Sequence, residues 1–600
     1  MRNKISNRLL SFLNSKYILY FVMIGLTAAY LNHFFSPEWW NTDLGGFDWD
    51  QHFFYLESTR KPIIDFKQFP FWNPYYAGGI PILENPQIKF FAPTNLFSFF
   101  MGSVKGLKIS ILFYHLAGVL GCIHLFRNVL KFRTLPTLLS SILFLFCGWH
   151  SQQIFPGHSQ FFSTPLLPFI AGFLVRFNTE RKFKDCFSAS LFMTILLSEG
   201  NIYIFLYLNL FLSLLVVYYF LTKETRFIAF NILKFLFLTF LLSSYRLFPE
   251  MDYFFHYGAF YKADTLSLNI FNAWDIFTNA SQHPFLAVPI AGQEYRWWEY
   301  GNYIGVLPFL IFVSLIGFTK KNELPFLILL VLSLLLMLGN FHTFSPANLL
   351  SHIPGFSNIR CYARWSIVFV FIFSVLIGIN LNRFIDKMFF YPNFQRSDSI
   401  KALFYTFLSA ICIYFYTDIS KKNGKNFKNI FIYSNVIVSE NTQNFETRNS
   451  FPSYGADSSL LTGIFQNKST RDAYENLLSN RNLPAAGDKN YRGEFFLTSG
   501  DVIKQTYWSP GELHFHTNVS KPGKLIINQN YNEQWKASSG HDIKNINGLI
   551  GVELLQGENN IVLHYLSDYF LLGSLLSITG LAFSIFWIFR QKSKNNPILF

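Results

Sequence analysis

Two carboxylates, an amide and an imidazole stand close together soon after the first apolar run of the chain: Asp48, Asp50, Gln51 and His52. A positioned carboxylate can act as a general base that removes a proton from a hydroxyl group. The amide and the imidazole can orient that base, or an acceptor, through hydrogen bonds. Asp is also a favoured helix cap, so either aspartate can instead begin a helix near Gln51. Both interpretations stay open at this stage.

Other polar residues suited to the same chemistry stand at the ends of later apolar runs. Glu199 ends one such run, where a carboxylate is costly unless it has a partner or a task. Arginines supply planar forks that hold phosphate oxygens, although they can also anchor to lipid headgroups. The candidate catalytic residues are therefore Asp50 and Asp48. The candidate substrate-binding residues are Gln51, His52, Glu199, Arg246, Glu299, Arg360 and Arg364.

The composition is that of an integral membrane protein. Of the 600 residues, 51% are hydrophobic and only 14% are charged, whereas soluble domains carry about 25% charged residues. The net charge of +14 comes mostly from short loops between apolar runs, so it indicates membrane orientation and not a nucleic-acid partner. The five cysteines are scattered and form no CxxC pattern. The sequence therefore requires no cofactor and indicates no divalent metal.

Apolar runs of about 17–25 residues predict membrane-spanning helices. About twelve such helices are expected, near residues 17–35, 108–126, 134–148, 160–177, 184–199, 202–222, 227–248, 303–319, 324–340, 365–382, 401–417 and 568–590. With the basic N-terminus inside, every basic loop falls on the cytoplasmic side, as the positive-inside rule requires. These loops are Arg127–Arg133, Arg176–Lys184, Lys223–Arg226, Lys320–Lys321, Arg383–Lys401 and Arg590–Lys594.

The same topology places the long polar segments outside. The membrane core is expected over 1–417 with a first outer loop at 36–107, followed by an outer domain at 418–567 and a final span with a basic tail at 568–600. In the outer domain, Leu513, Phe515, Thr517 and Val519 alternate with polar residues, which predicts a half-buried strand. Further strands are expected at 524–529, 549–555 and 560–565, with a hairpin turn at Asn547-Gly548. A β-rich, sandwich-like extracytoplasmic domain is therefore predicted.

Several short motifs stand at intervals along the chain. In the first outer loop they are Asp48-Trp49-Asp50-Gln51, Phe69-Pro70-Phe71-Trp72-Asn73-Pro74, Gly78-Gly79-Ile80-Pro81, Asn85-Pro86-Gln87 and Ala92-Pro93-Thr94-Asn95. Later ones are Glu299-Tyr300-Gly301-Asn302-Tyr303-Ile304-Gly305 and Pro354-Gly355-Phe356 with Arg360 and Arg364. The tail adds Pro522-Gly523-Lys524-Leu525, Tyr531, Trp535-Lys536-Ala537 and Leu555-Gln556-Gly557-Glu558-Asn559. Together these motifs resemble the YfhO-like family of bacterial membrane proteins.

The overall pattern is also similar to the polytopic glycosyltransferases of the C superfamily. That resemblance implies an acidic base in the first outer loop, here Asp48 or Asp50, and a polyprenyl-phosphate sugar as donor. It implies an envelope enzyme of the bacterial inner membrane, with both termini cytoplasmic, that transfers a sugar to a lipid, glycan or protein acceptor. A transporter or flippase, or a non-catalytic envelope assembly protein, is the alternative. Charges are scarce within the predicted spans and no inverted repeat is evident, which disfavours the transporter.

Overall fold

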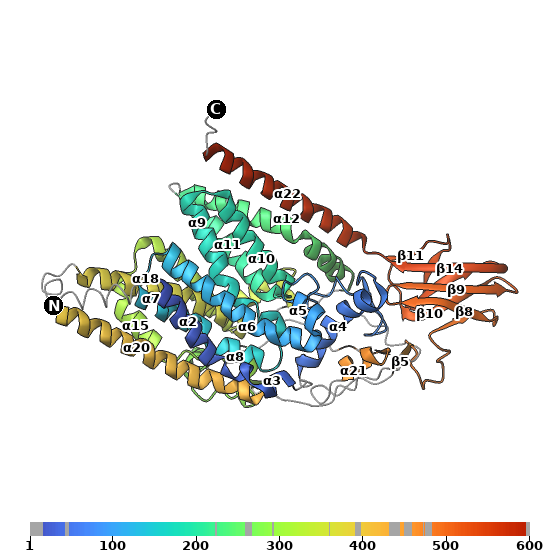
Figure 1. Cartoon of the computed structure of the whole chain (residues 1–600), viewed down its shortest axis with the longest axis horizontal. Coiled ribbons are helices and arrows are strands. Elements are labelled where there is room, and N and C mark those ends of the chain that lie inside the picture. Colours follow the sequence, from blue (N-terminus) through green and yellow to red (C-terminus); the bar gives the residue numbers. More distant parts are fainter. Residues whose placement is uncertain are drawn as a thin grey trace.

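The computed structural model describes residues 16–41, 47–222, 225–257, 267–290, 293–358, 361–389, 398–430, 445–448, 459–471, 473 and 483–595. Most of these residues are helical, and the long helices run roughly along the longest axis of the molecule (Figure 1). Their bounds are α2 Lys16–Tyr30, α6 Ser103–Cys122, α7 Thr134–Leu145, α9 Leu167–Glu180, α10 Phe183–Ser198, α11 Ile202–Leu221, α12 Arg226–Tyr257, α15 Leu307–Leu315, α16 Leu324–Met337, α18 Ser366–Phe389, α20 Asp398–Gly424 and α22 Asp568–Asn595.

A helix lies at each of the predicted apolar runs, and eight helical segments in the described part are long and apolar enough to cross a membrane. The first run is shorter than expected. Helix α2 ends at Tyr30, and the chain then turns through a short 3-10 helix at Asn32–Phe35 into α3 (Pro37–Asn41). This turn buries Phe34 and Trp39 against each other, with ring centroids 4.8 Å apart. Packing of aromatic side chains therefore ends the helix where hydropathy alone would continue it.

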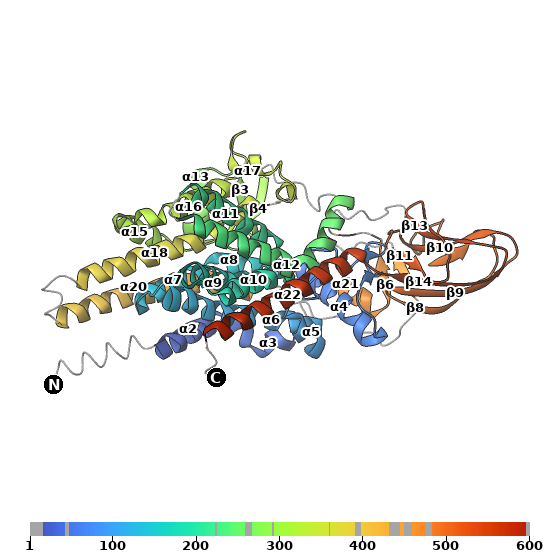
Figure 2. The same cartoon turned by 90° about the horizontal axis from the view of Figure 1, so that it is seen from above.

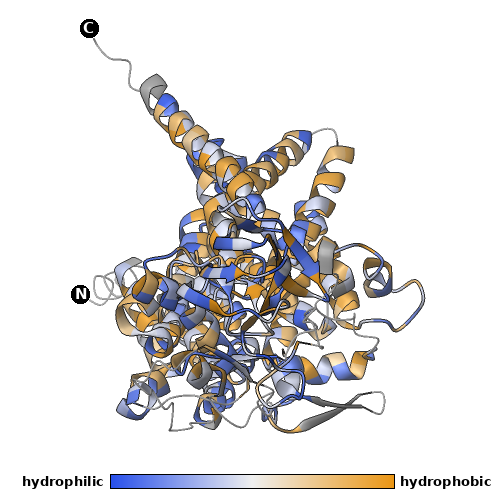
Figure 3. Ribbon diagram, turned by 90° about the vertical axis from the view of Figure 1, so that its right-hand side faces the viewer, coloured by the Kyte–Doolittle hydropathy of each residue, from blue (hydrophilic) through white to orange (hydrophobic). Residues whose placement is uncertain are grey.

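Helix α22 rests on α12 through small side chains. Ser577 Oγ donates to the Leu241 carbonyl at 3.0 Å and accepts from the Tyr245 amide at 3.0 Å. A Cβ added at Gly573 would lie 2.3 Å from the Ser244 carbonyl oxygen, so only glycine allows this approach. The opposite face of α22 exposes apolar side chains such as Leu575 and Ile578, and the helix that leads to the C-terminus is mostly orange in Figure 3. That face suits lipid contact.

The predicted first outer loop, residues 36–107, contains regular secondary structure and is called the first outer segment below. It contains α4 (Asp48–Phe66), a short β-ladder between β1 (Trp72–Asn73) and β2 (Ile80–Pro81), and α5 (Asn95–Met101). Every residue of α4 from Trp49 to Thr59 is buried, so this part of the helix is enclosed on all sides. The segment forms a layer between the long helices and the β-sheets (Figure 2).

Two four-stranded antiparallel sheets form the predicted β-sandwich. Their strand orders are β12-β13-β10-β7 and β11-β14-β9-β8. The strands are β7 Phe495–Leu497, β8 Ile503–Ser509, β9 Glu512–Val519, β10 Gly523–Asn530, β11 Trp535–Ala537, β12 Ile543–Ile546, β13 Leu549–Leu554 and β14 Gly557–Tyr565. A shared core joins both sheets, for example Leu525 with Leu563. Alternation along β9 and the Asn547-Gly548 turn, with φ values of 53° and 85°, are confirmed.

The expected domain boundaries change at two places. Helix α20 continues to Gly424, beyond the expected boundary at 417. A short helix, α21 (Ser459–Phe465), also belongs with the helical core and not with the sandwich, since Leu460, Leu461 and Ile464 are buried in that core against α4. In the other direction, Trp72 of the first outer segment enters the core of the sandwich. Contacts between distant segments set these limits, and composition does not reveal them.

Candidate functional site

Asp48 begins α4 and points at a histidine from another segment. Its carboxylate lies 3.2 Å from His158 Nε2, and His158 Nδ1 lies 2.7 Å from Gln153 Oε1. The preceding residue, Phe47, has φ 52°, an uncommon conformation for a bulky side chain. Its ring is held against Phe155. Asp48 retains 18% of its side-chain surface, so the carboxylate is oriented by the histidine and still reachable.

Asp50 has a different environment, because it caps a helix from a distant part of the chain. Its Oδ2 accepts from the Leu460 amide at 3.0 Å and its Oδ1 accepts from the Leu461 amide at 3.1 Å. Both amides belong to the first turn of α21, and Asp50 is only 1% exposed. Capping is thus the role that the contacts of Asp50 support, although the capped helix is α21 and not α4 itself.

His52 lies one helical turn after Asp48, and its imidazole is buried. Burial lowers the pKa of His52 to about 3, and the nearby Lys89 ammonium adds to this effect, so the ring is neutral. Its Nε2 has no hydrogen-bond partner in the described part of the chain. Gln51, in contrast, donates to the Tyr55 hydroxyl at 2.8 Å within α4. Of these two predicted residues, His52 therefore lies in the cluster with Asp48 and Gln51 supports the helix.

Glu199 is fully buried and has partners from the first outer segment and from α6. Thr94 Oγ1 donates to its carboxylate at 2.6 Å, the Tyr114 hydroxyl donates to the same oxygen, and Lys89 Nζ lies 3.4 Å away. Lys89 also donates to the Ser159 carbonyl at 2.7 Å. Burial lowers the pKa of Lys89, while the charge of Glu199 opposes that shift. The cost of the buried carboxylate is met by this ion pair and these hydrogen bonds.

The predicted phosphate-binding arginines are already engaged by carboxylates. Arg246 Nε lies 2.6 Å from Glu250, and its other nitrogens donate to the carbonyls of Leu83 and Asn85. Arg364 Nη2 and Nε donate to both oxygens of Glu299 at 2.8–3.2 Å. Arg360 lies outside the described residues. Arg246 therefore holds the first outer segment against α12, and Glu299 binds Arg364.

A cavity of about 360 Å³ opens between α11 and α12. Its wall is mostly apolar, with Phe205, Leu206, Leu247 and Phe254 among its residues. Its polar lining comes from Gln87, Gln160, Tyr203 and Glu250. Gln160 lies next to His52, and Glu250 is the partner of Arg246. The cavity wall is thus linked through Gln160 to His52, whose pKa is also affected by Lys89, Asp48 and His158.

Sequence reasoning missed Lys89 and Tyr114, although both contact Glu199. Lys89 carried a usable signal, because it stands between Ile88 and Phe90-Phe91 in an outer segment. A lysine among apolar residues that is not next to a predicted membrane end is a candidate for burial beside a carboxylate. Tyr114 carries no comparable signal, since tyrosines are frequent in this chain.

The part of the chain that the structure describes contains no cluster of three or more His, Cys, Asp or Glu side chains arranged to hold a metal ion. All five cysteines are buried and unbridged. No protein-family model matches the chain, and no curated protein matches it significantly. The functional assignment therefore has to come from the site itself.

Proposed function

We propose that this protein is a membrane glycosyltransferase that moves a sugar from a polyprenyl-phosphate-type lipid donor to an extracytoplasmic acceptor. The observation that carries the proposal is the apolar cavity between α11 and α12, whose lining residue Gln160 interacts with His52. A lipid chain needs an apolar path from the bilayer, and the sugar and phosphate need polar groups near the end of that path. Through His52, the cavity wall is linked to the neighbouring charged groups of Asp48 and Lys89.

Asp48 is the general base in this proposal, in preference to Asp50. A base must approach the acceptor hydroxyl, and Asp48 keeps 18% of its side chain exposed while Asp50 is 1% exposed. Both carboxylate oxygens of Asp50 also accept backbone amide hydrogen bonds, so neither is free of a protein partner. His158 holds Asp48 in one orientation, which is the role of the partner in an activated acid–base pair.

The proposed reaction is a single inverting displacement. The acceptor oxygen forms a bond to the anomeric carbon while the bond from that carbon to the phosphate oxygen breaks. The proton of the acceptor hydroxyl passes to Asp48, and the lipid phosphate leaves with the bonding electron pair. Among the charged groups that affect the pKa of His52, Lys89 has the largest effect, so its ammonium is proposed to stabilise the charge that develops on the phosphate.

The proposed topology has twelve spans, cytoplasmic termini and an extracytoplasmic sandwich in a bacterial inner membrane. It is supported by the basic loops, which alternate consistently with the helices. It is also supported by the arrangement in Figure 1 and Figure 2, where α22 leads away from the sandwich. Helix α4, which begins at Asp48, lies between the long helices and the sandwich, on the side where an acceptor from outside would arrive in this topology.

The test is sugar transfer by purified Asp48→Asn and Asp50→Asn variants in detergent or nanodiscs, supplied with polyprenyl-phosphate sugars. Asp48→Asn should lower the transfer rate by about 100-fold or more, with donor binding nearly unchanged because Asn keeps the size of Asp. Asp50→Asn keeps one capping oxygen and should lose much less activity.

Glu180→Gln, an exposed change on α9, is the matched control for removal of one carboxylate. Full transfer activity in the Asp48→Asn variant would overturn the assignment of the base. If the wild type bound the donor but transported it without transfer to any acceptor, the transporter alternative would replace the proposal.

A further inference from the structure

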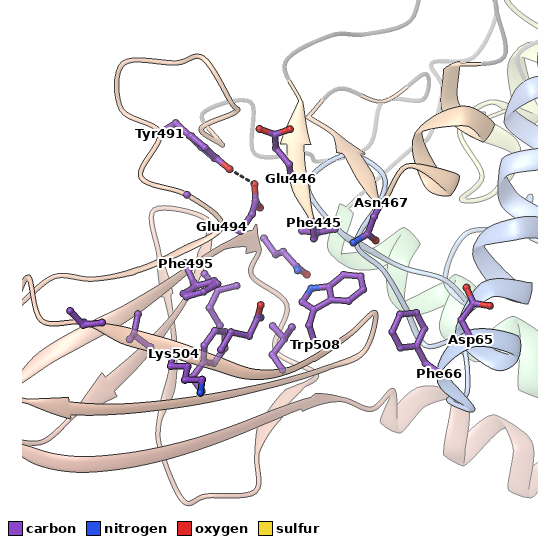
Figure 4. A pocket seen from close by; sticks show the side chains of 18 of the residues that line it. Asp65, Phe66, Phe445, Glu446, Asn467, Tyr491, Glu494, Phe495, Lys504 and Trp508 are labelled. Atoms are coloured by element: carbon purple, nitrogen blue, oxygen red, sulfur yellow. Dashed lines mark hydrogen bonds between the residues drawn. The ribbon is translucent and has the colours of Figure 1, made fainter. Parts of the chain in front are cut away.

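A second and larger cleft lies at the edge of the β-sandwich, away from the Asp48 cluster. Its volume is about 1630 Å³. It opens where β7 and β8, the edge strands of the two sheets, stand side by side without pairing. The C-terminal end of α4 and the strand β5 (Glu446–Arg448) close its other side (Figure 4). The sheets and the first outer segment therefore build this cleft together.

Aromatic rings line one part of the cleft. Trp508 is the central one, with ring centroids of Phe66 and Phe445 at 5.6 Å and 5.1 Å. A β-bulge between Gln505 and Tyr507 brings Trp508 to this side of β8. Without the bulge the alternation of the strand would turn Tyr507 inward. Tyr507 instead lies against His514 on the other face, 39% exposed.

Polar groups line the rest of the cleft, and their charges nearly cancel. The charged residues of the lining are two lysines, Lys61 and Lys504, and three carboxylates, Asp65, Glu446 and Glu494. Glu494 is fixed by the Tyr491 hydroxyl at 2.8 Å and by the Thr447 amide at 2.7 Å (Figure 4). Burial raises the pKa of Glu494. A polyanion would therefore meet little net positive charge here.

We infer that this cleft binds a glycan chain built of uncharged sugar units. The apolar C–H face of a sugar ring can lie flat on Trp508, while its hydroxyl groups exchange hydrogen bonds with carboxylate, amide and ammonium groups on the opposite wall. The volume exceeds the roughly 300–1,000 Å³ of sites for drug-sized ligands, which suits several linked sugars. The inference does not rest on the proposed transferase reaction, because binding here involves none of the Asp48 cluster.

The test is to measure whether the full-length protein in detergent binds oligomers of glucose or of N-acetylglucosamine. The oligomers should be about four to six units long, to suit the volume of the cleft. Tryptophan fluorescence and calorimetry report binding without turnover. Trp508→Leu should weaken binding about tenfold or more. Gln505→Ala should weaken binding by a smaller factor. Because Gln505 lies on the cleft surface, this variant keeps its fold and tests the inference even if Trp508→Leu does not fold.

Tyr507→Leu is the matched control, since it removes a neighbouring ring from the same strand on the opposite face. It should bind as the wild type does. Three outcomes would overturn the inference: no binding of any neutral oligomer, equal loss in the Tyr507 and Trp508 variants, or stronger binding of polyphosphate than of every sugar oligomer. Loss of transfer in the Asp48→Asn variant with intact oligomer binding would separate the two proposals.

Discussion

Asp48 and Asp50 are two residues apart, so on a helix their side chains point about 200° apart. His52 is four residues after Asp48 and shares its face. Distance along the chain predicts that Asp50 is the partner of Gln51 and His52. The helix begins at Asp48, however, and its geometry places Asp48 and not Asp50 on the same face as His52. The same geometry sends Asp50 toward α21, where its oxygens accept two backbone hydrogen bonds. Asp48 thus keeps part of its carboxylate accessible, whereas Asp50 stabilises the packing of α21.

Substitution of Asp50 by alanine should destabilise the docking of α21 on α4. Two buried amide groups would lose their acceptor, at about 1–3 kcal/mol for each unsatisfied group. Hydrogen–deuterium exchange should rise at residues 460–465, with a smaller rise in Asp50→Asn. Asp501→Ala is the control, because Asp501 accepts from the Ser520 amide at an exposed site. Unchanged exchange in Asp50→Ala would contradict the capping role.

His52 should make the protein sensitive to acid. Its folded pKa of about 3 lies below the value of about 6.5 expected in the unfolded chain. Only the unfolded chain then binds a proton, so stability is complete above about pH 6.5 and falls as the pH drops toward 3. Besides His52 itself, the groups that set this shift are Lys89, Asp48, His158 and Gln160.

Between pH 7 and pH 5, the wild type should therefore lose about 2 kcal/mol more than His52→Gln does. Thermal unfolding of both proteins at the two pH values measures the difference. His514→Gln, a half-exposed change on β9, is the control and should follow the wild type. Equal acid sensitivity of wild type and His52→Gln would show that His52 is not buried as a neutral ring.

At the scale of elements, the first outer segment ties the helices to the sandwich. Trp72 enters the sandwich core, where its Nε1 donates to Gln529 at 2.7 Å. Asn530, the next residue of the same strand, donates to the carbonyls of Ala77 and Gly79. Gly79 has φ 99°, and an added Cβ would lie 2.7 Å from the Trp72 ring. Close contact with Trp72 therefore explains Gly79, whereas a Cβ at Gly78 would meet Leu483 at 3.0 Å.

Trp72→Ala should loosen the sandwich from the helical core, because large-to-small changes at buried tryptophans cost about 3–5 kcal/mol. Limited proteolysis should release a fragment that contains the sandwich, and the unfolding temperature should fall. Trp274→Ala provides the control, since Trp274 is 45% exposed. If proteolysis and unfolding were the same in Trp72→Ala and wild type, the docking role of Trp72 would be wrong.

At the scale of the whole molecule, the sandwich lies at one end of the longest axis, and α18 and α20 reach the other end (Figure 1). Single cysteines test the proposed topology, and the five native cysteines are buried, so background labelling is low. Cysteines at the exposed positions Ser281 and Ser539 should react with an impermeant maleimide in intact cells, whereas one at Thr179 should react only after the membrane is opened. Labelling of Thr179 and Ser539 from the same side would refute the scheme.

Local patterns predicted the elements well and their long-range contacts poorly. The alternation in β9 and the Asn-Gly turn are properties of a few neighbouring residues, and both were predicted. The cap that Asp50 forms on α21 joins residues 410 positions apart, and no local pattern carries that information. The pairing of Arg364 with Glu299 is similar: sequence identified both as polar residues of the outer side but not as partners of each other.

Helix α4 carries Asp48 at its first turn and Phe66, a wall of the sandwich cleft, at its last. At about 1.5 Å per residue the two ends are roughly 27 Å apart. If the cleft holds one part of a glycan and Asp48 acts on another, this helix is a molecular ruler. Chains too short to span it would lose the gain in effective concentration that a second attachment point provides. Length selection would then be a property of one rigid helix.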